Sequence, residues 1–176
     1  MNALIRTGLA GVIALCSLWA HAQCPDETAV SAYLADFQGR RVSNGFGNEL
    51  SLEDAQCAKG RLIAALRSSQ GTLVGYKAAF TNPALQKRFG VPSPDWGAMF
   101  GGMMVESGAR LPAKYGARPL YEADFVAVVK DAGLADAKTP LEALAHLSEV
   151  RPFIELPDLM LEGNPSGTAL ISINVA

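Results

Sequence analysis

Residues 118–129, RPLYEADFVAVV, predict a β-strand that begins with two carboxylates. Side chains two residues apart point to the same face of a strand, so Glu122 and Asp124 would lie side by side. Residues 125–129 are all apolar, which is typical of a strand that is covered on both faces. Because an unpaired carboxylate is costly to bury, acids in this setting need a cation or a proton. The segment therefore predicts a strand with a polar site at its start.

A third acid, Glu155, stands in a second apolar strand context, PFIELPD at residues 152–158. Three carboxylates offer only oxygen ligands, which suit the hard cations Mg²⁺, Mn²⁺ and Ca²⁺. A plainer interpretation is that each acid is solvated at a strand end or pairs with an arginine. Spacing alone favours this plainer interpretation, because an acidic pair two residues apart is a weak motif.

The rest of the chain predicts an α+β fold class, in which N-terminal helices are followed by strands and short helices. Four residues that can cap a helix N-terminus mark the expected helix starts: Asp26, Ser51, Asn82 and Thr139. Further strands are expected at 71–80, 151–156 and in the final apolar run 168–176. The segment WGAMFGGMMV, residues 96–105, is expected to be a short strand or a lid.

The composition limits the kinds of partner that the protein can bind. The chain has 176 residues, which suits one domain, and its formal net charge is −2. Lysine and arginine form no run along the sequence. We therefore expect neither a nucleic acid nor an anionic membrane surface as a partner.

The N-terminus resembles a secretory signal peptide. Arg6 precedes an apolar run at residues 9–20, and the AHA of residues 20–22 fits the small residues of a cleavage site. The expected domains are therefore a signal peptide at 1–22, cut after Ala22, and one domain at 23–176. The protein would then be exported to the periplasm and free of the membrane after cleavage. The alternative is an uncleaved membrane anchor or a core helix.

Cleavage after Ala22 would leave two cysteines, Cys24 and Cys57. Cysteines of an exported protein can pair, because the compartment is oxidising. Such a bridge would tie the start of the first expected helix to the second and would stabilise the fold by closing a loop in the unfolded chain. The alternative is two unpaired, small apolar side chains.

Four motifs follow one another along the chain: Gly-x-Lys at 75–77, Pro-Asp-Trp-Gly at 94–97, Glu-x-Asp at 122–124 and Pro-x-x-Glu at 152–155. Their order and spacing resemble the 2-keto-4-pentenoate hydratase group of the fumarylacetoacetate hydrolase superfamily, over roughly residues 26–176. The resemblance implies a mixed, β-rich domain after the N-terminal helices. It stops before the last β-rich segment of the family domain, so we expect a truncated domain.

The resemblance also implies a site. The family's three metal ligands fall on Glu122, Asp124 and Glu155, and its active-site lysine and loop acid fall on Lys77 and Asp95. The second ligand is a glutamate in the family pattern, so Asp124 is a departure with a shorter side chain. Without the resemblance, Lys77 would be a strand lysine that reaches water, and Asp95 a turn residue after a proline.

The implied function is that of a Mg²⁺- or Mn²⁺-dependent hydratase of aromatic compound catabolism. The cation would hold the carboxylate and keto oxygen of a small 2-keto acid and stabilise an enolate while a lysine or acid moves protons. Close relatives decarboxylate or cleave a carbon–carbon bond, and a homo-oligomer is compatible with the resemblance. The alternative is a non-catalytic exported protein of the same fold that binds a small keto acid or a partner, or a truncated inactive relative.

Overall fold

A computed structural model describes residues 24–174 of the 176-residue chain, so the expected signal peptide at 1–22 lies outside the described residues. Two helices, α1 (Glu27–Gly39) and α2 (Leu52–Gln70), lie side by side and form one part of the body. Within residues 24–174, no helix is long and apolar enough to cross a membrane.

The helix starts predicted from the capping residues are confirmed. The Asp26 carboxylate accepts a hydrogen bond from the Ala29 amide at the start of α1, and the Ser51 hydroxyl accepts one from the Asp54 amide at the start of α2. Two shorter helices, α3 (Pro83–Phe89) and α4 (Pro140–Ala145), begin in the same way after Asn82 and Thr139. These starts depend on neighbouring residues only, which explains why local sequence predicts them.

Two antiparallel strands, β1 (Leu73–Ala79) and β2 (Asp95–Phe100), form a sheet against α2. The segment expected to be a strand or a lid is therefore a strand, followed by a 3₁₀ turn, η1 (Gly101–Met103). In the register of this sheet, Lys77 of β1 lies opposite Gly97 of β2, and Ala79 lies opposite Asp95.

The main core lies between the two long helices, β2 and the C-terminal segment. Its buried members are Tyr33, Leu62, Leu66, Ala98, Phe100, Met160, Leu161, Ala169 and Ile173. The Tyr33 hydroxyl donates to the Met160 sulfur at 3.1 Å, so this buried donor is satisfied. Burial, followed by repulsion from nearby aspartates, raises the pKa of Tyr33 above its ordinary value, and Tyr33 stays a neutral core residue.

The final apolar run is a helix, and the strand predicted at 168–176 is wrong within the described residues. Helix α5 (Gly167–Ser172) starts at Ser166, whose hydroxyl accepts a hydrogen bond from the Ala169 amide. α5 packs against α2 and buries Ala169 and Ile171. A short apolar run fits a buried helix as well as a buried strand, and only the packing on α2 decides between them.

The strand predicted from the opening segment is present, but its expected coverage is wrong. Within residues 24–174, β3 (Glu122–Val129) pairs with β4 (Leu147–Glu155) alone, and the two extend away from the body, with η2 (Ala132–Asp136) and α4 at the far end. Phe125 is 69% exposed and Ile154 is 58% exposed. A two-stranded ribbon without a neighbouring layer leaves both faces open to solvent, whatever its sequence.

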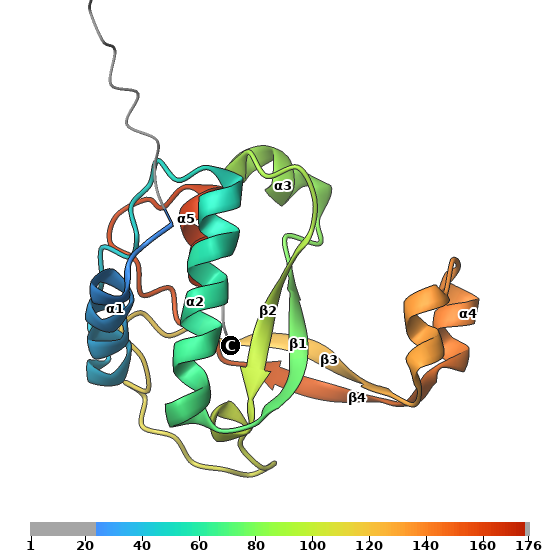
Figure 1. The fold of residues 1–176 in the computed structure, drawn as a ribbon. Helices are drawn as coiled ribbons and strands as arrows, with labels where there is room; N and C mark the ends of the chain where they lie inside the picture. Colours follow the sequence, from blue (N-terminus) through green and yellow to red (C-terminus); the bar gives the residue numbers. More distant parts are fainter. Residues whose placement is uncertain (1–23, 175–176) are drawn as a thin grey trace, which may run out of the picture.

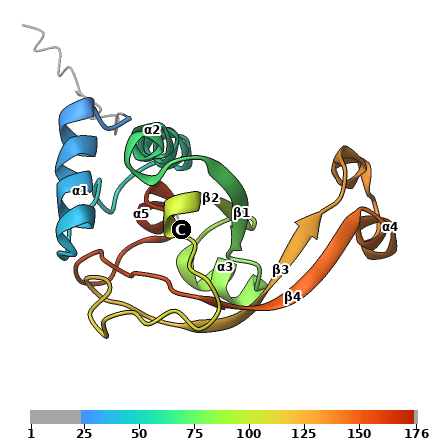
Figure 2. The same ribbon diagram turned by 90° about the horizontal axis from the view of Figure 1, so that it is seen from below.

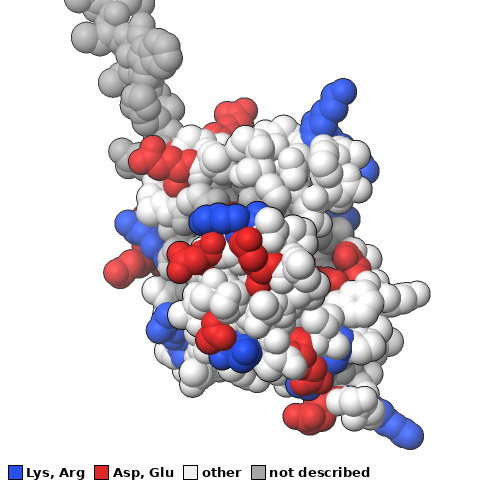
Figure 3. All heavy atoms as spheres, turned by 90° about the vertical axis from the view of Figure 1, so that its right-hand side faces the viewer, with Lys and Arg blue, Asp and Glu red and all other residues white. Residues whose placement is uncertain are grey.

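Acidic and basic side chains are interspersed on the face seen from the α4 side (Figure 3). This distribution agrees with the near-neutral composition of the chain.

A disulfide joins Cys24 to Cys57, with an S–S distance of 2.00 Å and Cα atoms 5.6 Å apart. The bond connects Cys24, three positions before the first residue of α1, to the first half of α2 and closes a separation of 33 residues. The two long helices are therefore held together both by packing and by a covalent bond.

Candidate functional site

Lys77 and Glu155 join the two sheets. They are 78 residues apart in sequence, yet the Lys77 Nζ lies 2.9 Å from the Glu155 Oε1. Their side chains are 18% and 21% exposed, so most of this ion pair is shielded from water. Lys77 is therefore directed into a carboxylate-bearing site, rather than out into the solvent as an isolated strand lysine would be.

The β3–β4 pairing places the three predicted ligands on one face of the hairpin. Glu122 lies directly opposite Glu155, and Asp124 lies two residues further along β3 on the same face. Both β3 acids are exposed, so the burial cost expected from the sequence does not apply to them in the described structure. One oxygen of Asp124 accepts a hydrogen bond from the Phe125 amide at 2.7 Å.

The three acids share a face but do not converge on a point. Within residues 24–174, no group of three or more His, Cys, Asp or Glu side chains is placed to hold a metal ion. Their donor atoms nevertheless fit a hard divalent cation, because all are carboxylate oxygens, and a positive group, the Lys77 ammonium, already lies against one of them. The assignment of Glu122, Asp124 and Glu155 as ligands therefore stays a prediction.

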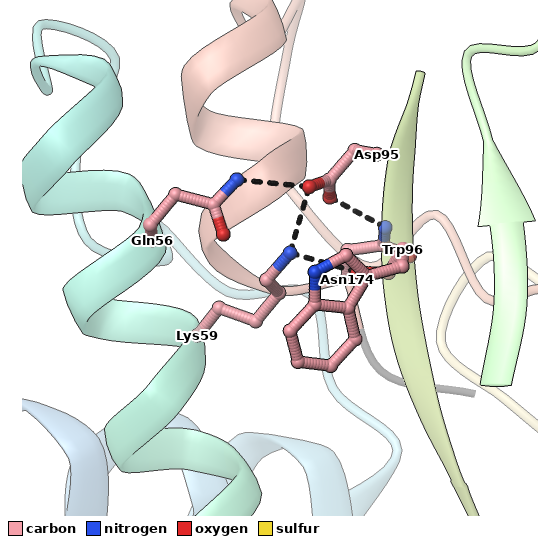
Figure 4. A network of polar contacts seen from close by, with 5 residues as sticks. All are labelled: Gln56, Lys59, Asp95, Trp96 and Asn174. Atoms are coloured by element: carbon pink, nitrogen blue, oxygen red, sulfur yellow. Dashed lines mark hydrogen bonds and ion pairs between the residues drawn. The ribbon is translucent and has the colours of Figure 1, made fainter. Parts of the chain in front are cut away.

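Asp95, the predicted loop acid, is the first residue of β2 and lies in a buried polar network (Figure 4). Its Oδ1 accepts hydrogen bonds from the Lys59 Nζ at 2.7 Å and from the Gln56 Nε2 at 2.9 Å. Its Oδ2 accepts one from the Asn174 Nδ2 at 2.8 Å. Asp95 is therefore more than a turn residue, because its side chain links β2 to α2 and to the C-terminal segment.

The network keeps Asp95 ionised. Burial alone would raise the pKa of the Asp95 carboxyl, but hydrogen bonds from Lys59, Asn174 and Gln56 and the Lys59 charge outweigh it. The pKa of Asp95 consequently lies below its ordinary value. Asp95 is an anion at neutral pH, with both oxygens already bonded to protein donors.

Gly97 connects this network to Lys77. A Cβ atom at Gly97 would lie 2.7 Å from the Asn174 backbone oxygen and side-chain Oδ1, and 3.0 Å from the Lys77 Cγ. Asn174 and the aliphatic part of Lys77 therefore both lie where a side chain at position 97 would collide with them. The Trp of the Pro-Asp-Trp-Gly motif lies on Lys59, whose Nζ is 4.3 Å from the centre of the Trp96 ring.

Sequence reasoning did not find Lys59 or Asn174. Lys59 lies at helical spacing between the buried residues Ala55, Leu62 and Leu66, and a lone lysine in an apolar stripe was an available sign of a buried ion pair. No sequence pattern marks Asn174 as part of the network, because its partner Asp95 is 79 residues away in sequence.

No family model matches the chain. Several curated relatives are similar to it, three of them as follows. A 2-keto-4-pentenoate hydratase of Burkholderia vietnamiensis is 32% identical over 94 residues, which cover 53% of this chain and 36% of the relative. A 4-oxalocrotonate decarboxylase of a Pseudomonas species is 33% identical over 99 residues, or 56% of this chain and 38% of the relative. A 2-hydroxypent-2,4-dienoate hydratase of Pseudomonas putida is 26% identical over 122 residues, or 69% of this chain and 54% of the relative.

The predicted resemblance to the 2-keto-4-pentenoate hydratase group is confirmed. The aligned segments span between 36% and 54% of the length of these relatives. The relatives are hydratases and a decarboxylase by name.

Solved structures agree on the fold. The 4-oxalocrotonate decarboxylase of Pseudomonas putida G7, complexed with magnesium and adipate, superposes with a TM-score of 0.69 at 19% identity, over 84% of this chain and 57% of that one. Its complex with calcium and acetate gives the same TM-score at 18% identity. The expected α+β class is therefore confirmed. Both complexes contain a divalent cation, which is a property of that enzyme.

Proposed function

We propose that the protein is a divalent-metal-dependent lyase that acts on a small 2-keto acid, with hydration of a 2-hydroxydienoic acid as its reaction. The observation that carries the proposal is the Lys77–Glu155 pair at 2.9 Å, on the hairpin face that also bears Glu122 and Asp124. The names of the curated relatives support the reaction class, and the magnesium of the structural relative supports the cation.

In this proposal, Glu122, Asp124 and Glu155 hold a Mg²⁺ or Mn²⁺ ion. When bound, the ion would supply Lewis acidity to the substrate's carboxylate and 2-keto oxygen and stabilise an enolate. Lys77 moves the proton at the carbon next to the keto group, since its Nζ already reaches the carboxylate face from β1. The resemblance also assigns a catalytic role to Asp95, which lies buried at the start of β2.

The test is hydration of 2-hydroxypenta-2,4-dienoate by purified protein with Mg²⁺, with and without EDTA. We expect turnover that EDTA abolishes and that Lys77→Met lowers by about 100-fold or more, as for removal of a general acid–base group. Lys87→Met, at an exposed position in α3, is the matched control and should leave turnover unchanged. A folded, metal-loaded wild type without turnover would contradict the proposal.

The alternative, a non-catalytic protein that binds a small keto acid, is distinguished by calorimetry. Titration with Mg²⁺ followed by oxalate or pyruvate would show binding without turnover if this alternative holds. The specific observation in its favour is the exposure of Glu122 and Asp124, which leaves the carboxylate face open.

Export to the periplasm is a separate proposal. The signal-like segment at residues 1–22 motivates it, and the Cys24–Cys57 disulfide is compatible with an oxidising compartment. We expect the mature protein in the periplasmic fraction of an expressing bacterium, with its N-terminus at Gln23 by mass spectrometry. Unprocessed protein in the cytoplasm would contradict it.

A further inference from the structure

We propose that Lys59 and Asn174, with Asp95 between them, are positioning residues that direct Lys77 at the carboxylate face, and that Asp95 acts through this network without touching the substrate. The inference depends on the proposed function, because it concerns the lysine of that site. It gives Lys59 and Asn174 a role and changes the role predicted for Asp95.

Lys59 fixes the start of β2 to α2. Its side chain is 1% exposed, and its ammonium donates to the Asp95 Oδ1 and to the Trp96 backbone oxygen, each at 2.7 Å. The ammonium also lies over the Trp96 ring. A buried ammonium is stable only with such partners, so the first two residues of β2 cannot shift relative to α2 without leaving a buried charge unpaired.

Asn174 connects the Asp95 network to the surroundings of Lys77. Its Nδ2 donates to the Asp95 Oδ2, and its backbone oxygen and Oδ1 occupy the space that a side chain at Gly97 would fill. The Lys77 side chain lies beside the same glycine, and its Nζ reaches Glu155. Lys77 and Asn174 therefore lie on the same side of Gly97, and Asn174 is held there by Asp95.

Asp95 is poorly placed to exchange protons with a substrate. Both of its oxygens accept hydrogen bonds from protein donors, three in all, and its side chain is 4% exposed. A carboxylate that transferred a proton would have to break these contacts and leave Lys59 unpaired in the interior. The geometry instead suits a fixed anion that orders its neighbours.

The decisive experiment compares Asp95→Asn, Lys59→Met and the double variant that carries both changes. Each single variant leaves a buried charge without its ion-pair partner, and we expect kcat to fall by about 100-fold as Lys77 moves, with KM little changed. The double variant removes both charges together and keeps a side-chain oxygen at position 95 that can still accept hydrogen bonds from Gln56 and Asn174, so kcat should recover to within about tenfold of wild type. If Asp95 instead touches the substrate, the folded double variant stays as inactive as Asp95→Asn, which would overturn the proposal.

A second measurement does not need turnover. In protein labelled with ¹³C-lysine, the Lys77 Cε signal is assigned from its loss in Lys77→Arg. We expect this signal to shift and sharpen in Asn174→Ala, because the side chain is released, and to stay unchanged in Asn164→Ala, an exposed asparagine used as the control. An unchanged Lys77 signal in Asn174→Ala overturns the positioning role. A wild type that is inactive in the hydration assay contradicts the proposed function alone.

Discussion

Glu122 and Glu155 are directly opposed cross-strand partners at the base of the β3–β4 hairpin. Like charges in this position repel one another, and the Lys77 ammonium, 2.9 Å from Glu155, offsets the repulsion from the neighbouring sheet. The base of the hairpin thus depends on a positive charge that does not belong to either of its strands. A bound divalent cation would serve the same purpose with more charge.

We predict that Mg²⁺ stabilises the wild-type protein. At 100 times its dissociation constant, a ligand that binds only the folded state adds about 2.7 kcal/mol to the free energy of unfolding. For a chain of this size, this corresponds to a rise in Tm of roughly 5–10 °C. Differential scanning calorimetry with and without MgCl₂ measures it.

The carboxylate variants make that prediction specific. Glu122→Gln and Glu155→Gln should each lose most of the Mg²⁺-dependent rise in Tm, because each removes one proposed ligand. Glu106→Gln, at an exposed position before β3, should keep it. An equal rise in all three variants would mean that Mg²⁺ binds elsewhere.

We predict that acid destabilises the fold through Asp95. The pKa of Asp95 in the folded protein lies below its ordinary value of 3.8. The ionised carboxylate therefore stabilises the fold at pH values above the unfolded value, and this contribution is lost as the pH falls through the lower folded value. Urea unfolding of wild type between pH 6 and pH 2.5 should show the loss below about pH 4.

The double variant Lys59→Met, Asp95→Asn provides the comparison for the acid experiment. It lacks the titrating carboxylate, so its stability should fall less steeply than that of wild type over the same pH range. Parallel curves for the two proteins would exclude Asp95 as the source of the acid sensitivity.

We predict that Gly97→Ala disturbs both the network and Lys77. The new Cβ would lie 2.7 Å from two oxygens of Asn174, one of them in the backbone, so the C-terminal segment or β2 must shift. Overpacking of this kind costs about 1–3 kcal/mol of stability. Gly60→Ala in α2 is the matched control, because a Cβ there meets nothing within 4 Å, and it should gain about 0.5–1 kcal/mol. Thermal unfolding of the two variants measures the contrast.

We predict that loss of the Cys24–Cys57 disulfide destabilises the protein strongly. The bond closes a separation of 33 residues, for which the chain-entropy model gives about 3–4 kcal/mol. The Cys24→Ala, Cys57→Ala double variant should show this loss in urea unfolding. Dithiothreitol should produce the same loss in wild type and no further change in the double variant.

The sequence predicted the parts of the fold that depend on neighbouring residues and missed those that depend on distant ones. The helix starts at Asp26 and Ser51 follow from side chains that bond amides three residues later, so they were predicted correctly. The final apolar run predicts a strand from sequence alone, and it forms the helix α5 because it packs against α2. The exposure of Phe125 likewise depends on what lies next to the hairpin.

The candidate site shows the same division. The i, i+2 spacing was enough to place Glu122 and Asp124 on one face of a strand, and the register adds Glu155 opposite. Family resemblance, and not spacing, indicated Lys77, whose contact with Glu155 spans 78 residues of sequence. Neither route could find Asn174, because its importance comes only from meeting Asp95 and Gly97 in space.

Cys57 lies on α2 between Gln56 and Lys59, the two helix residues that hold Asp95. The covalent bond to Cys24 therefore stabilises the part of α2 that supplies the hydrogen-bond donors to Asp95. Protein produced in a reducing cytoplasm would lack this support, and its Lys77 would be less well ordered, even if the fold survived. Any measurement of activity on this protein should therefore state whether the Cys24–Cys57 pair is oxidised or reduced.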